Sequence, residues 1–286
     1  MKQKLTVEKR EFGVWLDTDI TYSQVPGWAG RTTRDLKLSI IRPSKDLDRL
    51  LPVIVWVCGG AWLSMDWNVH LAEFVTLAKQ GYVIASVEYR TSNQACFPAQ
   101  LEDVKAAIRY LRANSQKYQI DPERIGVMGE SAGGHLAALI GTTGENREFD
   151  RGENLEQSSA VQAVCDWYGV VDLWELTIPG NGGNISNQAA TIAYQLLGEG
   201  ALENREISAK ANPLSYISKK TPPFLILHGN QDQVVPLKQS EKLYKALQKQ
   251  NITTEFYIIE GADHATAEFF QEETKEIIKD FFDQHL

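Results

Sequence analysis

The sequence predicts an α/β fold, in which a mostly parallel, twisted sheet carries helices on both faces. Two observations point to it. The run Pro52–Cys58 is almost entirely apolar, as expected of a strand buried on both faces of a parallel sheet. From that run to the C-terminus, strand-like and helix-like stretches alternate, which is typical of parallel strands connected by helices.

The elements before Pro52 are β-like, and those after it alternate. Phe12–Tyr22 and Asp35–Arg42 resemble strands joined through a turn at Pro26-Gly27. After Pro52–Cys58 we expect, in chain order, helix Val69–Gln80, strand Tyr82–Glu88, helix Pro98–Tyr118, strand Arg124–Met128, helix His135–Ile140, strands Val161–Tyr168 and Phe224–Leu227, helix Leu237–Gln250, strand Thr253–Ile259 and helix Ala267–Phe282.

Residues 174–212 interrupt this alternation. They contain Pro179–Gly183 and two weakly helical stretches, so we expect a small cap inserted over the edge of the sheet, with a long surface loop as the alternative. No repeat, low-complexity tract or Pro/Ser-rich linker is present in the sequence. A single domain over residues 1–286 is therefore the simplest organisation.

Charge and composition limit the partners of the chain. The net charge is −8 and no Lys/Arg cluster occurs, which argues against binding to nucleic acid or to an anionic membrane. The longest apolar run, Leu51–Leu63, is too short to span a bilayer, and the first ten residues lack the apolar core of a signal peptide. We therefore expect a cytoplasmic protein. Three widely spaced cysteines suggest neither a disulfide framework nor a metal site.

The motif Gly129-Glu130-Ser131-Ala132-Gly133 has the form G-x-S-x-G and lies between a β-like and a helix-like stretch. A serine at such a junction sits on a sharp turn, with its hydroxyl clear of the sheet. The alternative is an ordinary turn of small residues. Deciding between them requires a base and an acid, because a serine hydroxyl is a poor nucleophile unless an oriented base takes its proton.

His264 is the expected base. It lies in Gly261–His264, a loop between the last strand and the last helix, which opens at the same carboxyl edge of the sheet as Ser131. His135 follows Ser131 by one helical turn, so its side chain points along the helix instead of over the hydroxyl. A solvated loop histidine is the alternative for His264.

Asp232 is the expected acid, because it follows the strand Phe224–Leu227 and precedes a helix. A helix-entry aspartate is the alternative reading of Asp232. Asp166 and Asp172, after the preceding strand, are its rivals, and Asp263 is too close to His264 in the chain to reach its ring easily.

The expected oxyanion hole uses backbone N–H groups aimed where negative charge develops in an acyl-transfer intermediate. Ala132 begins the helix after the serine and offers one. Gly60 and Ala61, in the loop after the strand Pro52–Cys58, offer two more, while Gly59 shapes the turn. Trp62 and Glu130, beside these donors, are expected to contact the substrate.

The Gly59-Gly60 loop, the sharp turn at Ser131, Asp232 and His264 follow one another in the order typical of the α/β-hydrolase superfamily, which the sequence resembles over nearly the whole chain. It is nearest to esterases related to hormone-sensitive lipase and to bacterial acetyl/feruloyl esterases. The stretches that carry it are Ser86–Arg90, Phe97–Val104, Ile120–Ile125, Gly129–Gly134 and Asp232–Pro236. The resemblance implies an α/β-hydrolase fold and a serine carboxylesterase with no cofactor or metal.

One departure from these families lies at Cys58, where they usually have a histidine that is thought to brace the oxyanion loop. A thiol is a weak donor and acceptor, so the loop here needs a different brace.

Trp62, Trp67 and Trp174 are candidate rim aromatics, and no long amino-terminal cap precedes the first strand, which favours short acyl groups such as acetyl. The expected substrate is a small ester, with carbohydrate deacetylation as one form of the reaction and homo-oligomerisation left open. An arylformamidase or a small prolyl-oligopeptidase-type peptidase would use the same residues. A non-catalytic ligand-binding protein on this fold is the alternative from another class.

Overall fold

The computed structural model describes residues 1–8, 13–27, 30–44, 48–176, 187–198 and 205–286. Within these ranges eight strands form one sheet in the order β1-β2-β4-β3-β5-β6-β7-β8. The β1–β2 and β2–β4 pairs are antiparallel, and every pair from β4–β3 to β7–β8 is parallel. The strands are β1 (Val14–Pro26), β2 (Thr33–Pro43), β3 (Leu51–Val57), β4 (Val83–Val87), β5 (Ile120–Glu130), β6 (Ala163–Trp167), β7 (Phe224–Gly229) and β8 (Thr254–Ile259). The predicted mostly parallel α/β fold is confirmed.

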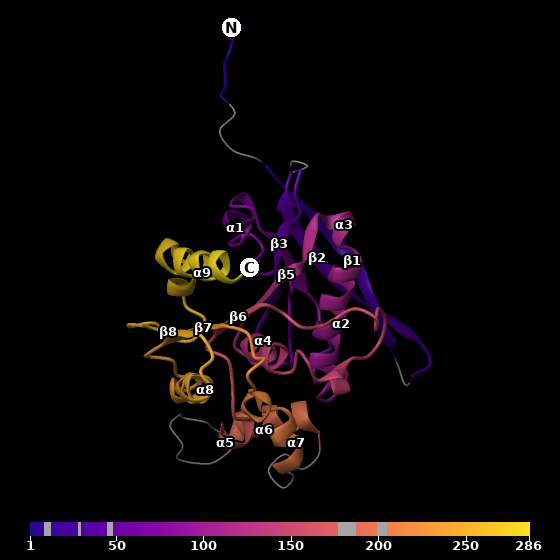
Figure 1. The fold of residues 1–286 in the computed structure, drawn as a ribbon, viewed down its shortest axis with the longest axis vertical. Coiled ribbons are helices and arrows are strands. Elements are labelled where there is room, and N and C mark those ends of the chain that lie inside the picture. The colour runs from indigo at the N-terminus through magenta and orange to yellow at the C-terminus, as the bar shows by residue number, and fades with distance from the viewer. Residues whose placement is uncertain (9–12, 28–29, 45–47, 177–186, 199–204) are drawn as a thin grey trace.

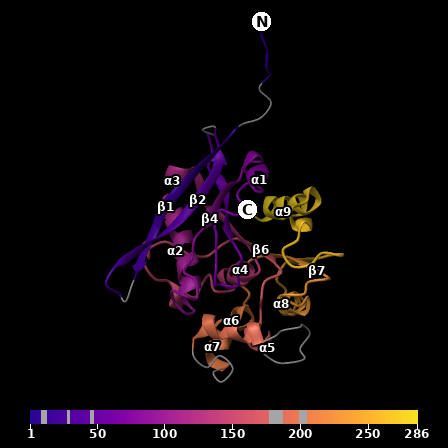
Figure 2. The same cartoon turned by 180° about the vertical axis from the view of Figure 1, so that it is seen from behind.

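Helices cover both faces of the sheet, as Figures 1 and 2 show from opposite sides. The helices α2, α4 and α8 pack over one face, and α1 and α9 over the other. The α-helices are α1 (Val75–Lys79), α2 (Ala99–Ala113), α3 (Ser115–Tyr118), α4 (Ala132–Thr142), α5 (Leu173–Leu176), α6 (Asn187–Leu197), α7 (Arg205–Lys210), α8 (Lys238–Lys249) and α9 (Glu272–His285), and the 3₁₀ turns are η2 (Arg147–Phe149), η3 (Pro213–Tyr216) and η4 (Ala267–Phe270).

The central strand β3 shows why the apolar run is continuous. Val53, Val55 and Val57 belong to the core beneath α2 and α4, whereas Ile54 and Trp56 belong to the core beneath α1 and α9. Successive side chains of a strand point to opposite faces, so a strand covered on both sides must be apolar at every position.

Three predicted helices are shortened or divided in the structure. Of the stretch Val69–Gln80 only Val75–Lys79 is α-helical, because the residues before it form successive turns in which N–H groups bond to carbonyls three residues back, as Phe74 does to Leu71. The stretch Pro98–Tyr118 is divided into α2 and α3 at Asn114, whose side-chain amide donates to the Tyr110 carbonyl.

The last predicted helix, over 267–282, is also divided. Residues 267–270 form the 3₁₀ turn η4, and α9 begins only after Gln271, whose backbone is extended. The described part of the first predicted strand starts at Val14, and Phe12 lies outside the described residues.

Between β6 and β7 the chain forms α5, α6, α7 and η3, and of these η3 follows the predicted cap region 174–212. Figure 1 shows the three helices gathered at one end of the molecule, beyond α4 and α8. Residues 177–186, which include Pro179–Gly183, and 199–204 lie outside the described residues. The single-domain organisation remains a prediction.

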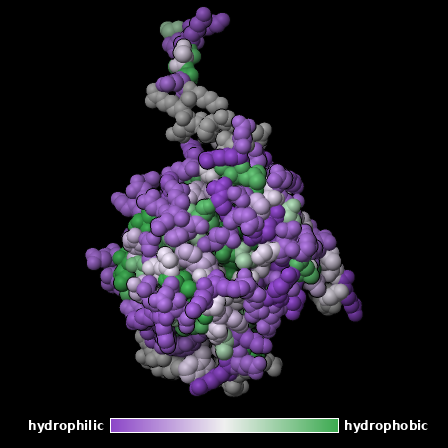
Figure 3. All heavy atoms as spheres, in the orientation of Figure 1, coloured by the Kyte–Doolittle hydropathy of each residue, from purple (hydrophilic) through white to green (hydrophobic). Residues whose placement is uncertain are grey.

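The described residues include no helix with the length and apolar character needed to cross a bilayer. The face seen in Figure 3 is mostly hydrophilic, with small apolar areas between polar ones. Within the described ranges, no group of three or more His, Cys, Asp or Glu side chains is arranged to hold a metal ion.

Candidate active site

Ser131 occupies the sharp turn that joins β5 to α4. Its φ of 53° and ψ of −117° lie outside the common regions for a residue with a side chain, a strain that costs of order 1–3 kcal/mol. The turn is tight enough that a Cβ on Gly133 would lie 1.9 Å from the Val57 carbonyl oxygen. Only glycine fits there, and its absence of a side chain lets α4 start directly beside β3.

Ser131, His264 and Asp232 form a chain of two hydrogen bonds. His264 Nε2 is 3.0 Å from Ser131 Oγ, and His264 Nδ1 is 2.7 Å from Asp232 Oδ2. The Ser131 hydroxyl donates to Nε2 when Nδ1–H donates to the carboxylate, so the second bond selects the tautomer that makes Nε2 an acceptor. The structure therefore brings together the three residues expected from the sequence.

The Asp232 carboxylate is held in its ionised form. Oδ1 accepts the backbone N–H groups of Val234 and Val235, each at 2.8 Å, while Oδ2 faces His264 and His228. Burial acts to raise the pKa of Asp232, but the hydrogen bonds from His228, His264 and Val235 outweigh it and hold the pKa well below its usual range.

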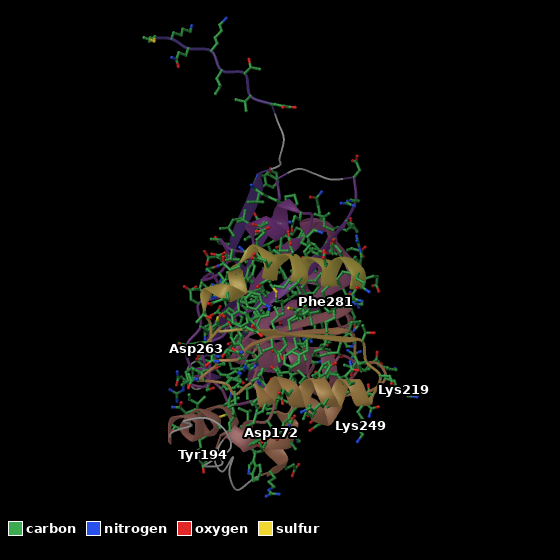
Figure 4. All side chains as sticks on the ribbon, turned by 90° about the vertical axis from the view of Figure 1, so that its left-hand side faces the viewer. Asp172, Tyr194, Lys219, Lys249, Asp263 and Phe281 are labelled. Carbon is green, nitrogen blue, oxygen red and sulfur yellow. The ribbon has the colours of Figure 1, made fainter. Side chains whose placement is uncertain are left out.

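Parallel strands explain why these residues meet. Ser131, Asp232 and His264 follow β5, β7 and β8, and the carboxyl ends of parallel strands share one edge of the sheet. Figure 4 shows Asp263, the residue before His264, at the end of the sheet away from Lys219 and Lys249, which precede β7 and β8.

The rival aspartates have other partners. Asp166 is fully buried and accepts the Gly169 N–H at 2.9 Å, and burial raises its pKa to about 7. Asp172 accepts a backbone N–H of α5 and lies 3.7 Å from Lys242 Nζ. Asp263 accepts its neighbour's backbone N–H and that of Gln233, which fastens the His264 loop.

The other two histidines near the site also have hydrogen-bond partners of their own. His135 is buried, with Nε2 at 2.7 Å from the Ala211 carbonyl, and burial lowers its pKa to about 4. His228 Nδ1 lies 2.7 Å from Ser240 Oγ. His264 is the ring that lies within hydrogen-bonding distance of the Ser131 hydroxyl, as expected over His135.

The loop after β3 passes directly in front of Ser131. A Cβ on Gly59 would lie 3.2 Å from Ser131 Cβ. Gly60 has a φ of 117°, and a Cβ there would lie 1.8 Å from the Ser64 carbonyl oxygen, so this position requires glycine. Ala61 and Trp62 follow with φ of 54° and 57°, a left-handed conformation that costs roughly 1–2 kcal/mol for each residue with a Cβ.

A cavity of about 80 Å³ lies beside the serine. Ala61 and Ala132, two of the expected oxyanion donors, line it, whereas Gly60 is not among its lining residues and accepts the N–H groups of Leu63 and Ser64. The full lining is mostly apolar and consists of Ala61, Trp62, Ser131, Ala132, Val170, Leu173, Leu176, Ile192, Ala193, Val234 and Val235.

Trp62 forms part of this wall as expected, with 3% of its surface exposed and its ring 5.1 Å from that of His135. Trp67 instead donates its indole N–H to Ser39, and Trp174 lies against Arg205 in a separate hollow. The rim of the described cavity therefore contains one of the three expected tryptophans.

Glu130 is placed differently from the expectation that it contacts substrate. Its carboxylate points into the protein, where it accepts the Gly59 N–H at 3.2 Å and the Tyr168 hydroxyl at 2.8 Å and lies 3.2 Å from His70 Nε2. Burial acts to raise the pKa of Glu130, but the hydrogen bonds from these three partners, that of His70 foremost, bring it below the usual value. It is not one of the residues that line the cavity.

Cys58 is buried, which raises the pKa of its thiol even though the sulfur accepts a backbone N–H of Asp66. The Cys58 carbonyl accepts the Tyr89 hydroxyl at 2.9 Å. Besides the contact at the sulfur, Tyr89 and Glu130 hold the loop, and the sequence indicated neither of them for this role.

The chain is similar to a family model and to proteins that are named esterases. A model of the BD-FAE family matches residues 38–247. Esterase LipC of Mycobacterium tuberculosis is 30% identical over 215 residues, which are 74% of this chain and 52% of LipC. Esterase LipQ of the same organism is 31% identical over 227 residues, 78% of this chain and 52% of LipQ. The chain spans about half the length of these curated relatives.

Among solved structures, a truncated carbohydrate esterase from gut microbiota is 29% identical with a TM-score of 0.81, covering 98% of this chain and 99% of that one. A bifunctional GH43-CE protein of Bacteroides eggerthii is 33% identical with a TM-score of 0.82, covering 94% of this chain and 35% of that one. The α/β-hydrolase resemblance noted from the motifs is confirmed. Because the family model matches well over half of the sequence, this chain belongs to the BD-FAE family.

Proposed function

We propose that this protein is a serine carboxylesterase that hydrolyses short-chain acyl esters, with acetylated carbohydrates as its substrate class. The observation that carries the proposal is the line Ser131 Oγ, His264 and Asp232, with separations of 3.0 Å and 2.7 Å. Nucleophile, base and orienting acid at these distances form the arrangement that activates a serine hydroxyl.

In the proposed reaction, Ser131 Oγ attacks the ester carbonyl as His264 Nε2 takes its proton. The tetrahedral intermediate collapses, the carbon–oxygen bond of the ester breaks, and His264 returns the proton to the departing alcohol. Water then attacks the acyl-enzyme with His264 again as base, which releases the acid and restores Ser131. Asp232 stays ionised and stabilises the imidazolium in both halves of the cycle.

The backbone N–H groups of Ala132 and Ala61 are the proposed oxyanion donors, with Gly60 as a third. Ala132 is the first residue of α4, where N–H groups have no acceptor within the helix and the helix dipole favours negative charge. A donor held in place before reaction stabilises the developing charge without reorganisation, which is often the largest contribution to such catalysis.

The size of the cavity supports a short acyl group. A cavity of about 80 Å³ bounded by Trp62, Leu173, Leu176 and Ile192 matches the size of an acetyl to butyryl chain. The proposal of a carbohydrate substrate rests on the solved relatives. The gut-microbiota protein is a carbohydrate esterase, and an acetyl ester-xyloside bifunctional hydrolase of Caldicellulosiruptor lactoaceticus is 25% identical with a TM-score of 0.72, covering 92% of this chain and 96% of that one.

The experiment that tests the proposed esterase function is fluorophosphonate labelling with peptide mapping, followed by a substrate panel. We expect the label on Ser131, and we expect Ser131→Ala to lose both labelling and hydrolysis of p-nitrophenyl acetate. A Ser131→Ala protein as active as wild type would exclude this mechanism. In the panel, acetylated xylo-oligosaccharides should react faster than an N-formyl aryl amide or a prolyl peptide anilide, and the reverse order would favour an arylformamidase or a peptidase.

A further inference from the structure

The carboxylate of Glu130 is buried behind the loop that the proposed function uses as an oxyanion hole. Only 9% of its side chain is exposed, yet it has three hydrogen-bond donors. Oε1 receives the Gly59 N–H and faces His70 Nε2, both at 3.2 Å, and Oε2 receives the Tyr168 hydroxyl at 2.8 Å. A carboxylate accepts all of these bonds at once, which no neutral side chain of the same shape can do.

The loop that Glu130 contacts has a conformation that the local sequence does not favour. Gly60, Ala61 and Trp62 have φ of 117°, 54° and 57° in succession. Left-handed residues with a Cβ persist only where surrounding contacts fix them. The bond from the Gly59 N–H to Glu130 lies immediately before this strained stretch, so it controls the direction in which the next N–H groups point.

Tyr168 joins this bracing contact to the catalytic base. Its hydroxyl bonds to Glu130, while its ring packs at 4.7 Å and 62° against the ring of His264. His70 is itself fixed by packing against Phe270, with ring centroids 4.7 Å apart. The orientations of the loop and of the base thus depend on one connected set of side chains.

We propose that Glu130 is a positioning residue that, through the Gly59 N–H, holds this loop with the N–H groups of Gly60 and Ala61 toward the reacting oxygen, and that Tyr168 and His70 hold Glu130 in turn. This inference rests on the proposed esterase function. It assigns to Glu130 no contact with substrate. Glu130 stabilises the tetrahedral intermediate instead of the bound ester, because only the intermediate carries an oxyanion that needs the N–H groups of the loop.

The test uses Glu130→Gln in the full chain. Glutamine keeps the shape but offers one acceptor and an NH₂ group to three facing donors, so the loop loses its fixed partner. We expect kcat for p-nitrophenyl acetate to fall about 10- to 100-fold, less than or equal to the effect of deleting one oxyanion donor, with KM little changed. The Ki of a short trifluoromethyl ketone, which forms a tetrahedral adduct with Ser131, should rise by the same factor.

Further variants keep the result interpretable if Glu130→Gln does not fold. Tyr168→Phe removes one oxygen and retains the ring against His264, and it should give a smaller loss in the same direction. His70→Gln keeps an N–H donor and should retain more activity than His70→Leu. Glu123→Gln, whose side chain is 84% exposed, is the matched surface control and should equal wild type in thermal midpoint, kcat and Ki.

A folded Glu130→Gln protein with unchanged kcat and unchanged ketone affinity would overturn the inference. So would an equal rise in KM and Ki, which would indicate contact with the ester itself. Fluorophosphonate labelling of Ser131 tests the esterase proposal separately, so labelled wild type combined with an unaffected Glu130→Gln variant rejects the positioning role alone.

Discussion

His228 Nε2 lies 3.3 Å from Asp232 Oδ2, the oxygen that also faces His264. The same nitrogen is 2.8 Å from the Val235 carbonyl, which only accepts, so Nε2 carries the proton and Nδ1 accepts from Ser240. Asp232 therefore receives the His264 Nδ1–H and two backbone N–H groups, and it shares the single Nε2–H of His228 with the Val235 carbonyl. That environment keeps the carboxylate charged and fixes its direction toward the base.

Replacing Asp232 by Asn tests this arrangement. The amide has the same shape but no charge, and it no longer requires the His264 tautomer with the proton on Nδ1. We expect kcat to fall roughly 10³- to 10⁴-fold, as triads of this kind lose when the acid is made neutral. The measurement is kcat/KM on p-nitrophenyl acetate, with circular dichroism as the folding control. A loss of less than tenfold would contradict the role of Asp232.

Activity should fall on acidification. His264 can accept the serine proton only while Nε2 is unprotonated, so acid removes the base. Asp232 stays ionised in mild acid because its hydrogen-bond partners hold its pKa well below the usual value. We therefore expect kcat/KM to fall on acidification without a second step from Asp232. A rate that does not change on acidification would argue against His264 as the base.

Enlarging the acyl cavity should change chain-length preference. Leu176 lines the cavity from α5, and Leu176→Ala creates space at its wall. We expect the ratio of hexanoate to acetate hydrolysis to rise about tenfold, since one or two methylene groups in an apolar pocket are discriminated at that level. Leu155→Ala, at an exposed position outside the cavity, is the control and should leave the ratio unchanged. Wild-type protein that prefers palmitate esters to acetate would refute the short-acyl proposal.

Asp166 gives a prediction about stability instead of rate. Burial raises its pKa to about 7 in the folded protein, above the unfolded value near 3.8, so the folded state binds its proton more tightly. The stability that this protonation contributes is present at acid pH and is lost as pH rises through about 7. Asp166→Asn removes the ionisation and keeps an acceptor for the Gly169 N–H.

Urea unfolding at several pH values checks this prediction. The stability of Asp166→Asn relative to wild type should increase between about pH 4 and 8, by at most about 4 kcal/mol for a pKa that differs by roughly three units between the folded and unfolded states. The control is Asp283→Asn, whose wild-type carboxyl has a lowered pKa and is about half exposed, so it should not reproduce that trend. A difference between Asp166→Asn and wild type that is independent of pH would show that Asp166 does not titrate in this way.

The strands and the triad could be predicted because burial and topology constrain them strongly. Residues of β3 must be apolar when both faces are covered, and the loops after β5, β7 and β8 must open at one edge when those strands are parallel. Ser131, Asp232 and His264 follow from these two facts together with the chemistry that a serine needs.

Other features depend on interactions that a linear pattern does not encode. Leu71 and Phe74 have helical spacing, but whether their N–H groups bond three or four residues back is decided by geometry, and here it is three. Glu130 was expected to contact substrate because it neighbours Ser131, yet the direction of its side chain is fixed by Tyr168 and His70, which are far from it in the sequence. No sequence signal marked either partner.

The helices between β6 and β7 and the loops of the sheet contribute separately to the cavity. Leu176, Ile192 and Ala193 come from α5 and α6, whereas Ser131, Asp232 and His264 lie on loops that follow strands of the sheet. Under the proposed esterase function, substitutions in α5 and α6 would therefore alter which ester is accepted while Ser131, His264 and Asp232 stay in place. A lineage that carries this fold could diversify its substrates through α5 and α6 alone, and a chimera that exchanges those helices between relatives would inherit the chemistry of one parent and the selectivity of the other.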